Sequence, residues 1–326
     1  MSDKLNILTL NVRGFNEKTK RRDIFQWIRH QKASIVVLQE IHGEGANTDT
    51  WEKEWGGKII LSKGSNNSRG VAILFTKKLN FQIDSVYKDS QGRIVIVNGT
   101  NDNKGFSLCG VYAPNESVQR KNFFSNLTNI IDEYCIYENL VLAGDFNCAI
   151  NRLDRISHSV SVDKSVNSLR KLLNHFGLVD IWRQQHPNLQ QFTWRRLRPN
   201  PIHSRIDYIF IVKHLVNSVK KVDIRPALKT DHMAVYFELV QEKNDRGPGT
   251  WKFNNYLLKK EDYVSSIRNV IGSCKIKYAN LNAKVKWDLT KKDIKEFTTV
   301  YSHNATKNSN RTIVELEKQL CSAENI

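Results

Sequence analysis

The chain has 326 residues, enough for one large α/β domain with or without an appended unit, so its size places no limit on the fold. Lysine and arginine number 50 against 33 acidic residues, and the net charge of +17 favours a polyanionic partner such as nucleic acid, with an acidic membrane surface as the competing partner. The amino terminus lacks the basic and apolar regions of a signal peptide, and the apolar runs are far shorter than a bilayer span, so we expect a soluble protein of the nucleus and/or cytoplasm with no membrane partner.

Short apolar runs rich in β-branched residues recur along the first part of the chain, and stretches with helical periodicity lie between some of them. The helical stretches are residues 18–30, 119–134 and 164–176. This alternation predicts an α/β (α+β) fold in which two packed sheets carry helices on their outer faces. The predicted strands are residues 6–12, 34–41, 71–76, 93–97, 106–112, 140–143, 206–212 and 234–240.

A turn-rich segment at residues 244–249, with the sequence Asn-Asp-Arg-Gly-Pro-Gly, ends this pattern. The residues after it are rich in lysine and asparagine and favour helix. We therefore predict an α/β domain over residues 1–242 and a basic, mostly helical linker or C-terminal extension over residues 243–326. The lysines of the extension either bind nucleic acid without sequence specificity or only keep the surface solvated, and both interpretations stay open.

Polar residues that can carry chemistry stand at the ends of the predicted strands. Glu40 ends one apolar run, and Asp145 and Asn147 end another. Asp207 lies within an apolar run, where a charged group needs a partner. Because strands are rigid, they can aim such groups at one point. The candidate set is Asn11, Glu40, Tyr112, Asp145, Asn147, Asp207, Asp231 and His232.

Hydrolysis of a phosphodiester requires this mixture of groups. Magnesium is a hard cation that prefers oxygen ligands, so Glu40 can hold Mg²⁺ together with a substrate phosphate, with Mn²⁺ as the alternative ion. Asp145 can orient or deprotonate the attacking water, and Asn147 can donate hydrogen bonds beside it. Asp145 and Asn147 are two positions apart, so an extended backbone would turn both side chains to the same side.

The remaining candidates suit a transition state that gains negative charge on the phosphate oxygens. A cationic His232 ring and the Asn147 amide can stabilise that charge. Asp207 can accept the other ring N–H of His232, which fixes the tautomer of the imidazole and raises its basicity. Tyr112 can donate a hydrogen bond to the phosphate or assist the leaving oxygen.

Several of these residues also have a simpler interpretation. Asn11 can be a turn residue, and Glu40 can be the exposed end of a strand. Asp145 with Asn147 can form a plain turn, and Asp231 with His232 can be a helix N-cap or a surface pair. The joint occurrence of all of them in this order is what favours an active site.

As an ordered set, these motifs resemble the endonuclease/exonuclease/phosphatase superfamily, which includes DNase I, exonuclease III and the apurinic/apyrimidinic endonucleases. The likeness covers residues 5–240. It implies a DNase I-like, four-layer sandwich of two sheets with the active site at one edge. The metal ligands that it implies are Glu40, Asn11 and Asp231. The catalytic residues that it implies are Tyr112, Asp145, Asn147, Asp207, Asp231 and His232.

Within the superfamily, the chain resembles the endonuclease domain of LINE-type non-LTR retrotransposons, which nicks target DNA ahead of a reverse transcriptase. This resemblance rests on residues 7–14, 144–155 and 192–194, and on residues 249–258, which are similar to the linker that leads toward the polymerase in such elements. The repair enzymes of the superfamily usually carry a second acidic residue just after the first asparagine. This chain has Arg13 there, which again favours the retroelement likeness.

The arginine-rich stretch that follows residue 193 lies between two strand-like segments, and the retroelement likeness implies a DNA-contacting hairpin there. A solvated basic loop is the simpler alternative. A basic cluster that opens the first predicted helix is a second candidate for phosphate contact: Lys18, Lys20, Arg21 and Arg22. The candidate DNA-binding residues are Thr193, Arg195, Arg196, Arg198 and Arg13.

We expect a Mg²⁺-dependent endonuclease that nicks double-stranded DNA and leaves a 3′ hydroxyl. The same residues support a second hypothesis, an abasic-site endonuclease or a 3′–5′ exonuclease of the exonuclease III kind. A lipid phosphodiesterase is a more distant alternative, and an inactive DNA-binding fragment is an alternative of a different class. No reverse-transcriptase motif follows, so we interpret the chain as a fragment of such an element, and no protein partner is inferred.

Overall fold

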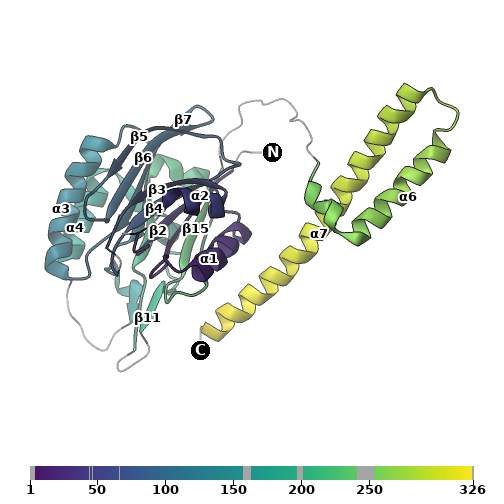
Figure 1. The fold of residues 1–326 in the computed structure, drawn as a ribbon. Helices are drawn as coiled ribbons and strands as arrows, with labels where there is room; N and C mark the ends of the chain where they lie inside the picture. Colours follow the sequence, from purple (N-terminus) through teal and green to yellow (C-terminus); the bar gives the residue numbers. More distant parts are fainter. Residues whose placement is uncertain are drawn as a thin grey trace. The chain divides into compact units, whose positions relative to one another are not determined.

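The computed structural model describes residues 4–43, 45, 47–65, 67–156, 163–196, 201–240 and 253–324. The chain divides into two compact units, Met1–Asn244 and Asp245–Ile326. The first unit contains the sheets and the second contains helices (Figure 1). Within the described residues, no helix is both long and apolar enough to cross a membrane.

The first unit is built on two mixed six-stranded sheets. The first sheet has the order β14-β15-β1-β2-β4-β3, and β1 with β2 is its parallel pair. All other neighbours in this sheet are antiparallel. Its strands are β1 (Lys4–Asn11), β2 (Ile35–Gln39), β3 (Gly57–Ser62), β4 (Val71–Thr76), β14 (Val219–Arg225) and β15 (Ala234–Val240).

The second sheet repeats this arrangement. Its order is β10-β13-β8-β7-β6-β5, with β7 and β8 as the parallel pair and antiparallel neighbours elsewhere. Each sheet therefore has a parallel pair at its centre and antiparallel strands toward both edges. The strands are β5 (Phe81–Lys88), β6 (Ile94–Asn101), β7 (Lys104–Tyr112), β8 (Leu140–Asp145), β10 (Leu178–Asp180) and β13 (Asp207–Val212).

The two sheets pack face to face, and helices cover their outer faces, which gives four layers (Figure 1). Side chains alternate along each strand, so Leu5 and Ile7 of β1 enter the core between the sheets, whereas Leu8 and Leu10 pack toward the outer helices. α1 and α2 cover the first sheet, and α3 and α4 cover the second. The helices are α1 (Lys18–His30), α2 (Thr48–Trp55), α3 (Ser117–Tyr134), α4 (Ser165–His175) and α5 (Ile181–Gln185).

A third, small sheet extends the first unit. Its order is β11-β12-β9, and β11 with β12 forms an antiparallel hairpin. This hairpin lies between residue 193 and β13 in the chain, at the arginine-rich stretch for which the retroelement likeness implies a hairpin. The strands are β9 (Arg155–Ile156), β11 (Trp194–Arg196) and β12 (Ile202–Ser204).

The second unit is a pair of packed helices, α6 (Glu261–Lys277) and α7 (Ala283–Glu324), preceded by the short helix η3 (Asn255–Lys259). Tyr263 is fully buried between the helices, and its hydroxyl forms a hydrogen bond of 2.7 Å with the Thr298 hydroxyl. The predicted fold, a two-sheet sandwich with outer helices and a helical C-terminal region, is confirmed.

Candidate active site

The carboxyl ends of the two parallel pairs meet, one from each sheet. Asn11 and Gln39 are partners at the end of β1 and β2, and Tyr112 and Asp145 are partners at the end of β7 and β8. Asn11 joins the two sheets, because its Nδ2 donates to Glu40 Oε1 at 2.8 Å and to Asp145 Oδ2 at 3.0 Å. A single buried amide thus fixes the distance between the two predicted carboxylates.

Asp145 is held from a second direction by the turn that follows it. The backbone N–H of Asn147 donates to Asp145 Oδ1 at 2.9 Å, and Asn147 Nδ2 donates to the carbonyl of Ala113 at 2.9 Å. The prediction of an extended backbone through both residues is wrong, because β8 ends at Asp145 and Asn147 has a left-handed conformation with φ of 52°. The turn lets the Asn147 backbone, rather than its side chain, contact the carboxylate.

Asp207 and His232 form the predicted pair. Asp207 begins β13 and is the direct cross-strand partner of Asp145, so strand register places these two carboxylates side by side. His232 Nδ1 lies 2.9 Å from Asp207 Oδ2, and both side chains are buried. Burial opposes charging of the ring, but the adjacent Asp207 carboxylate and its hydrogen bond raise the pKa of His232 to about 9.

The pKa values of two neighbouring side chains, Asp145 and Tyr112, are also raised. Burial, followed by the negative charge of Asp207, raises the pKa of Asp145 to about 7. Burial, followed by the charges of Glu40 and Asp145, raises the pKa of the Tyr112 hydroxyl well above its ordinary value. Tyr112 therefore stays a hydrogen-bond donor at neutral pH, and the three groups form an environment that favours bound protons or a cation.

The donor set of the site fits a divalent cation. Among the described residues, Asp145, Asp207 and His232 offer ligand atoms that lie within 4.8 Å of one another. Asp207 Oδ1 is buried without a hydrogen-bond partner, which a cation or a water would satisfy. The expected ligand Glu40 stands outside this group of three but is joined to Asp145 through Asn11. We favour the oxygen donors over His232, because its Nδ1 already contacts Asp207 and Mg²⁺ prefers oxygen.

Asp231, an expected ligand, lies at the rim of the site. Its Oδ2 accepts from Arg13 Nη1 at 2.9 Å and from the Trp194 indole N–H at 3.1 Å. The positively charged Arg13 side chain thus forms an ion pair with Asp231, and this side chain is 66% exposed. Because Trp194 also forms a β-bridge with His232, these contacts connect the segment after β1, the β11–β12 hairpin and the segment that carries the histidine.

The predicted DNA-binding residues differ in exposure. Thr193 is fully buried, and its hydroxyl accepts hydrogen bonds from the backbone N–H groups of Ile206 and Asp207. Its side chain therefore supports the start of β13 and is not accessible to DNA. Arg195 and Arg196 lie on β11, where Arg196 is exposed. Arg198 lies outside the described residues.

Two basic residues are structural rather than surface groups. Arg21, one of the helix residues considered for phosphate contact, is buried and forms a bidentate pair with Glu54, at 2.6 and 3.1 Å. Arg205 is 1% exposed and is paired with Asp154 and Asp180 at 2.9 and 2.6 Å. Arg205 ties β12 and β13 to neighbouring segments and so supports Asp207, two residues further along the chain.

His42 was missed by the sequence analysis. Its Nε2 lies 3.5 Å from Glu40 Oε2, and its side chain is 17% exposed. The signal that could have found it is a histidine two residues after a carboxylate at a strand end. Its position beside Glu40 depends on a left-handed backbone at both residues, which the sequence does not predict.

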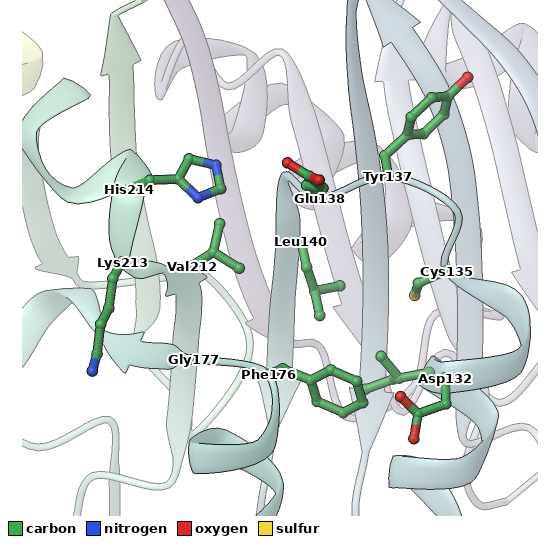
Figure 2. A pocket seen from close by; sticks show the side chains of 11 residues that line it. Asp132, Cys135, Tyr137, Glu138, Leu140, Phe176, Gly177, Val212, Lys213 and His214 are labelled. Carbon is green, nitrogen blue, oxygen red and sulfur yellow. The ribbon is translucent and has the colours of Figure 1, made fainter.

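A separate pocket of about 570 Å³ lies at the opposite end of β8 and β13, around Leu140 and Val212 (Figure 2). Asp145, at the other end of β8, is roughly 17 Å away because each strand residue advances about 3.3 Å. Cys135 and His214 also line this pocket. It is therefore distinct from the cluster described above.

Residues 8–232 match the Endonuclease/Exonuclease/phosphatase family, and the chain belongs to this family. It is thus a member of a family of enzymes that hydrolyse phosphate esters, as the motifs predict. The Transposon TX1 uncharacterized 149 kDa protein of Xenopus laevis is 29% identical over 324 residues, which cover 98% of this chain and 24% of that protein. The chain therefore spans less than a third of this relative, and the predicted likeness to a transposon-encoded protein is confirmed.

Solved structures of low sequence identity share the fold. An AP endonuclease of Leishmania major is 16% identical, with a TM-score of 0.63, and the match covers 73% of this chain and 88% of that one. An AP endonuclease of Archaeoglobus fulgidus is 22% identical, with a TM-score of 0.58, over 72% of this chain and 98% of that one. A 3′ phosphatase of Neisseria bound to a product DNA hairpin is 22% identical, with a TM-score of 0.58, over 73% of this chain and all of that one. The DNase I-like fold is confirmed.

Proposed function

We propose that this chain is a Mg²⁺-dependent endonuclease that nicks double-stranded DNA and leaves a 3′ hydroxyl. The observation that carries the proposal is the buried His232–Asp207 pair beside Asp145, with Asn11 joining Asp145 to Glu40. This arrangement supports a base, a cationic group and a metal ligand acting at one point. The net charge of +17 and the exposed arginines at the rim support a polyanionic substrate.

Asp145 is the residue that we assign to the attacking water. Its carboxylate is fixed on both oxygens, by the Asn11 amide and by the Asn147 backbone N–H, so it approaches the water from a defined direction. A pKa near 7 lets it take a proton at physiological pH and return it later. Asn147 therefore acts here by positioning Asp145, and we propose this role in place of direct donation to the phosphate.

His232 is the residue that we assign to the negative charge of the transition state. With a pKa of about 9 the ring is protonated at neutral pH, and Nδ1 is held by Asp207, which leaves Nε2 to donate to a phosphate oxygen. Tyr112, which keeps its proton, can donate beside it. Burial excludes water from these donors and strengthens them.

Glu40 is the residue that we assign to the metal, and Asn11 is the group that orients Glu40. When bound, Mg²⁺ supplies Lewis-acid polarisation of the phosphate. We retain Asp231 as an expected residue of the metal shell, although its contacts with Arg13 and Trp194 point to a second role. That role is to hold Arg13 at the rim, where the exposed guanidinium can contact a DNA phosphate.

The decisive experiment is nicking of supercoiled plasmid by the full chain with Mg²⁺ and with EDTA. We expect open circles only with Mg²⁺, and extension of the nicks by a DNA polymerase without prior phosphatase treatment, because the product end is a 3′ hydroxyl. Asp145→Ala and His232→Ala should each lower the rate by at least about 10²-fold with DNA affinity retained. His175→Ala, at an exposed helix position, is the matched control and should nick as the unaltered chain does.

The same preparation separates this proposal from the abasic-site hypothesis. Duplexes of one sequence, with and without a central abasic site, are compared under identical conditions. Similar rates on both duplexes support a nicking endonuclease of intact DNA. A rate on the abasic duplex that exceeds the intact one by orders of magnitude would instead assign the chain to repair, and no cleavage of either would leave only DNA binding.

A further inference from the structure

The Glu40–His42 segment is built as a rigid, strained loop. Both residues have left-handed backbone conformations, with φ of 52° and 53°, which L side chains rarely adopt and which cost about 1–3 kcal/mol each. Backbone hydrogen bonds hold the segment on both sides. Gly14 N–H donates to the Glu40 carbonyl at 2.7 Å, and His42 N–H donates to the Arg69 carbonyl at 3.0 Å. The two side chains approach each other in this loop, with Glu40 Oε2 3.5 Å from His42 Nε2.

The His42 ring is packed closely within this loop. A Cβ at position 14 would lie 3.3 Å from His42 Nδ1, so Gly14 leaves room for the ring. The side-chain amide of Asn16 donates to the His42 carbonyl. His42 Nε2 is buried and has no hydrogen-bond partner among the described residues, although Glu40 Oε2 is 3.5 Å away. A buried polar atom without a partner points to a missing ligand.

The spacing of these two atoms suits a shared cation. Two ligands bound at about 2.1 Å to one ion lie about 3.0 Å apart in an octahedral site and about 3.4 Å apart in a tetrahedral site. A nitrogen and an oxygen 3.5 Å apart need only a small side-chain rotation to meet that requirement. The other Glu40 oxygen, Oε1, accepts from Asn11, so Oε2 is the oxygen that this pairing uses.

We propose that His42 is a metal ligand and supplies a nitrogen donor beside Glu40 Oε2. An imidazole donor is of little benefit to Mg²⁺ but strengthens binding of Mn²⁺ and later transition metals. The site therefore binds Mn²⁺ more tightly than a site built from oxygen donors alone. This inference rests on the metal role proposed above for Glu40, but it concerns which ion the chain binds and not whether it cleaves DNA.

The test uses the full chain with Mn²⁺ as the probe and without DNA. Pulsed EPR of bound Mn²⁺ should show coupling to nitrogen, and that coupling should change when the protein is made with ¹⁵N-histidine. The nitrogen coupling should vanish in His42→Ala and persist in His232→Ala. Mn²⁺ affinity should fall on the order of tenfold in His42→Ala, while Mg²⁺ affinity, measured by competition, falls less than about threefold.

His175→Ala is the matched control and should bind both ions as the unaltered chain does, because this ring is exposed and pairs with Asp132. Absence of nitrogen coupling, or its persistence in His42→Ala, would overturn the proposal. Equal losses of Mn²⁺ and Mg²⁺ affinity would also overturn it and make His42 a positioning residue for Glu40. The isotope experiment repeated in His232→Ala needs no change at position 42, so nitrogen coupling that persists there excludes His232 as its source even if His42→Ala does not fold. Failure to nick DNA would affect only the proposed function.

Discussion

Removal of the negative charge of Asp207 tests the proposed role of the Asp207–His232 pair. Asp207→Asn keeps the shape of the side chain but removes the anion that contacts His232 Nδ1 at 2.9 Å. That contact helps to raise the pKa of the ring from its ordinary 6.5 to about 9, a difference worth roughly 3 kcal/mol in favour of the charged form. Without the anion, burial opposes the charged ring and only the smaller effects of the Asp145 and Asp231 charges still favour it, so the pKa of His232 falls.

The expected consequence is a loss of rate with retained DNA binding. If the protonated ring stabilises the transition state as proposed, roughly 3 kcal/mol corresponds to a decrease in kcat of about 10²-fold at pH 7.5. The sign of the pH effect follows from the same shift. A raised pKa keeps the imidazolium present below about pH 9 and loses it as the pH rises through that value. In Asp207→Asn this alkaline loss of activity moves to lower pH.

The assay is kcat for plasmid nicking between pH 5.5 and 10, together with NMR titration of the His232 ring in both proteins. The acidic limb should fall as Asp145, with its pKa near 7, gains a proton, and a bound cation moves that limb lower. Asp132→Asn is the matched control, since it alters an exposed His175–Asp132 pair of the same chemistry. An unchanged His232 titration or an unchanged rate in Asp207→Asn would refute the reasoning.

Three further predictions address the fold and the DNA contact. Gly144→Ala should give no folded protein, judged by soluble yield and thermal melting, because Gly144 has φ of 151° and an added Cβ would lie 1.9 Å from the Val111 carbonyl oxygen. Arg205→Ala should lower the free energy of unfolding in urea by about 3–5 kcal/mol, since it removes the arginine partner of Asp180 and one of the two arginine partners of the buried Asp154, and an unchanged midpoint would contradict this. Arg196→Ala should weaken DNA binding and reduce the slope of log Kd against log salt by about 1, while the rate on saturating DNA stays the same.

The strands that the sequence did not reveal in the two large sheets all lie at sheet edges. β3, β14, β5 and β10 are the outer strands of their sheets, whereas the predicted strands occupy inner positions. Inner strands are buried on both faces and therefore appear as apolar runs, but an edge strand can be polar. β5 shows this clearly, because most of its side chains are only partly buried or exposed. Apolar patterning thus predicts the inner strands of each sheet and misses the edge strands.

For the candidate site, the sequence predicted the Asp207–His232 contact but not the other contacts described above. Glu40, Asp145 and Asp207 could be found because a carboxylate beside an apolar strand is unusual. The pairing of Arg13 with Asp231 could not be found, because the two residues are 218 positions apart and meet only when β1 and the end of the chain's first unit come together. His42 was missed because its proximity to Glu40 requires a left-handed backbone at both Glu40 and His42.

The repeated order of the two sheets explains why the site forms where it does. A parallel pair brings the carboxyl ends of two neighbouring strands to one edge, and each sheet has one such pair at its centre. When the sheets pack face to face, the four strand ends meet, and Asn11 spans the gap to Asp145. The chain leaves these ends through left-handed residues at Arg13, Glu40 and Asn147, each costing about 1–3 kcal/mol. Packing of two complete sheets must offset that strain, so the geometry of the candidate site depends on both sheets rather than on any local motif.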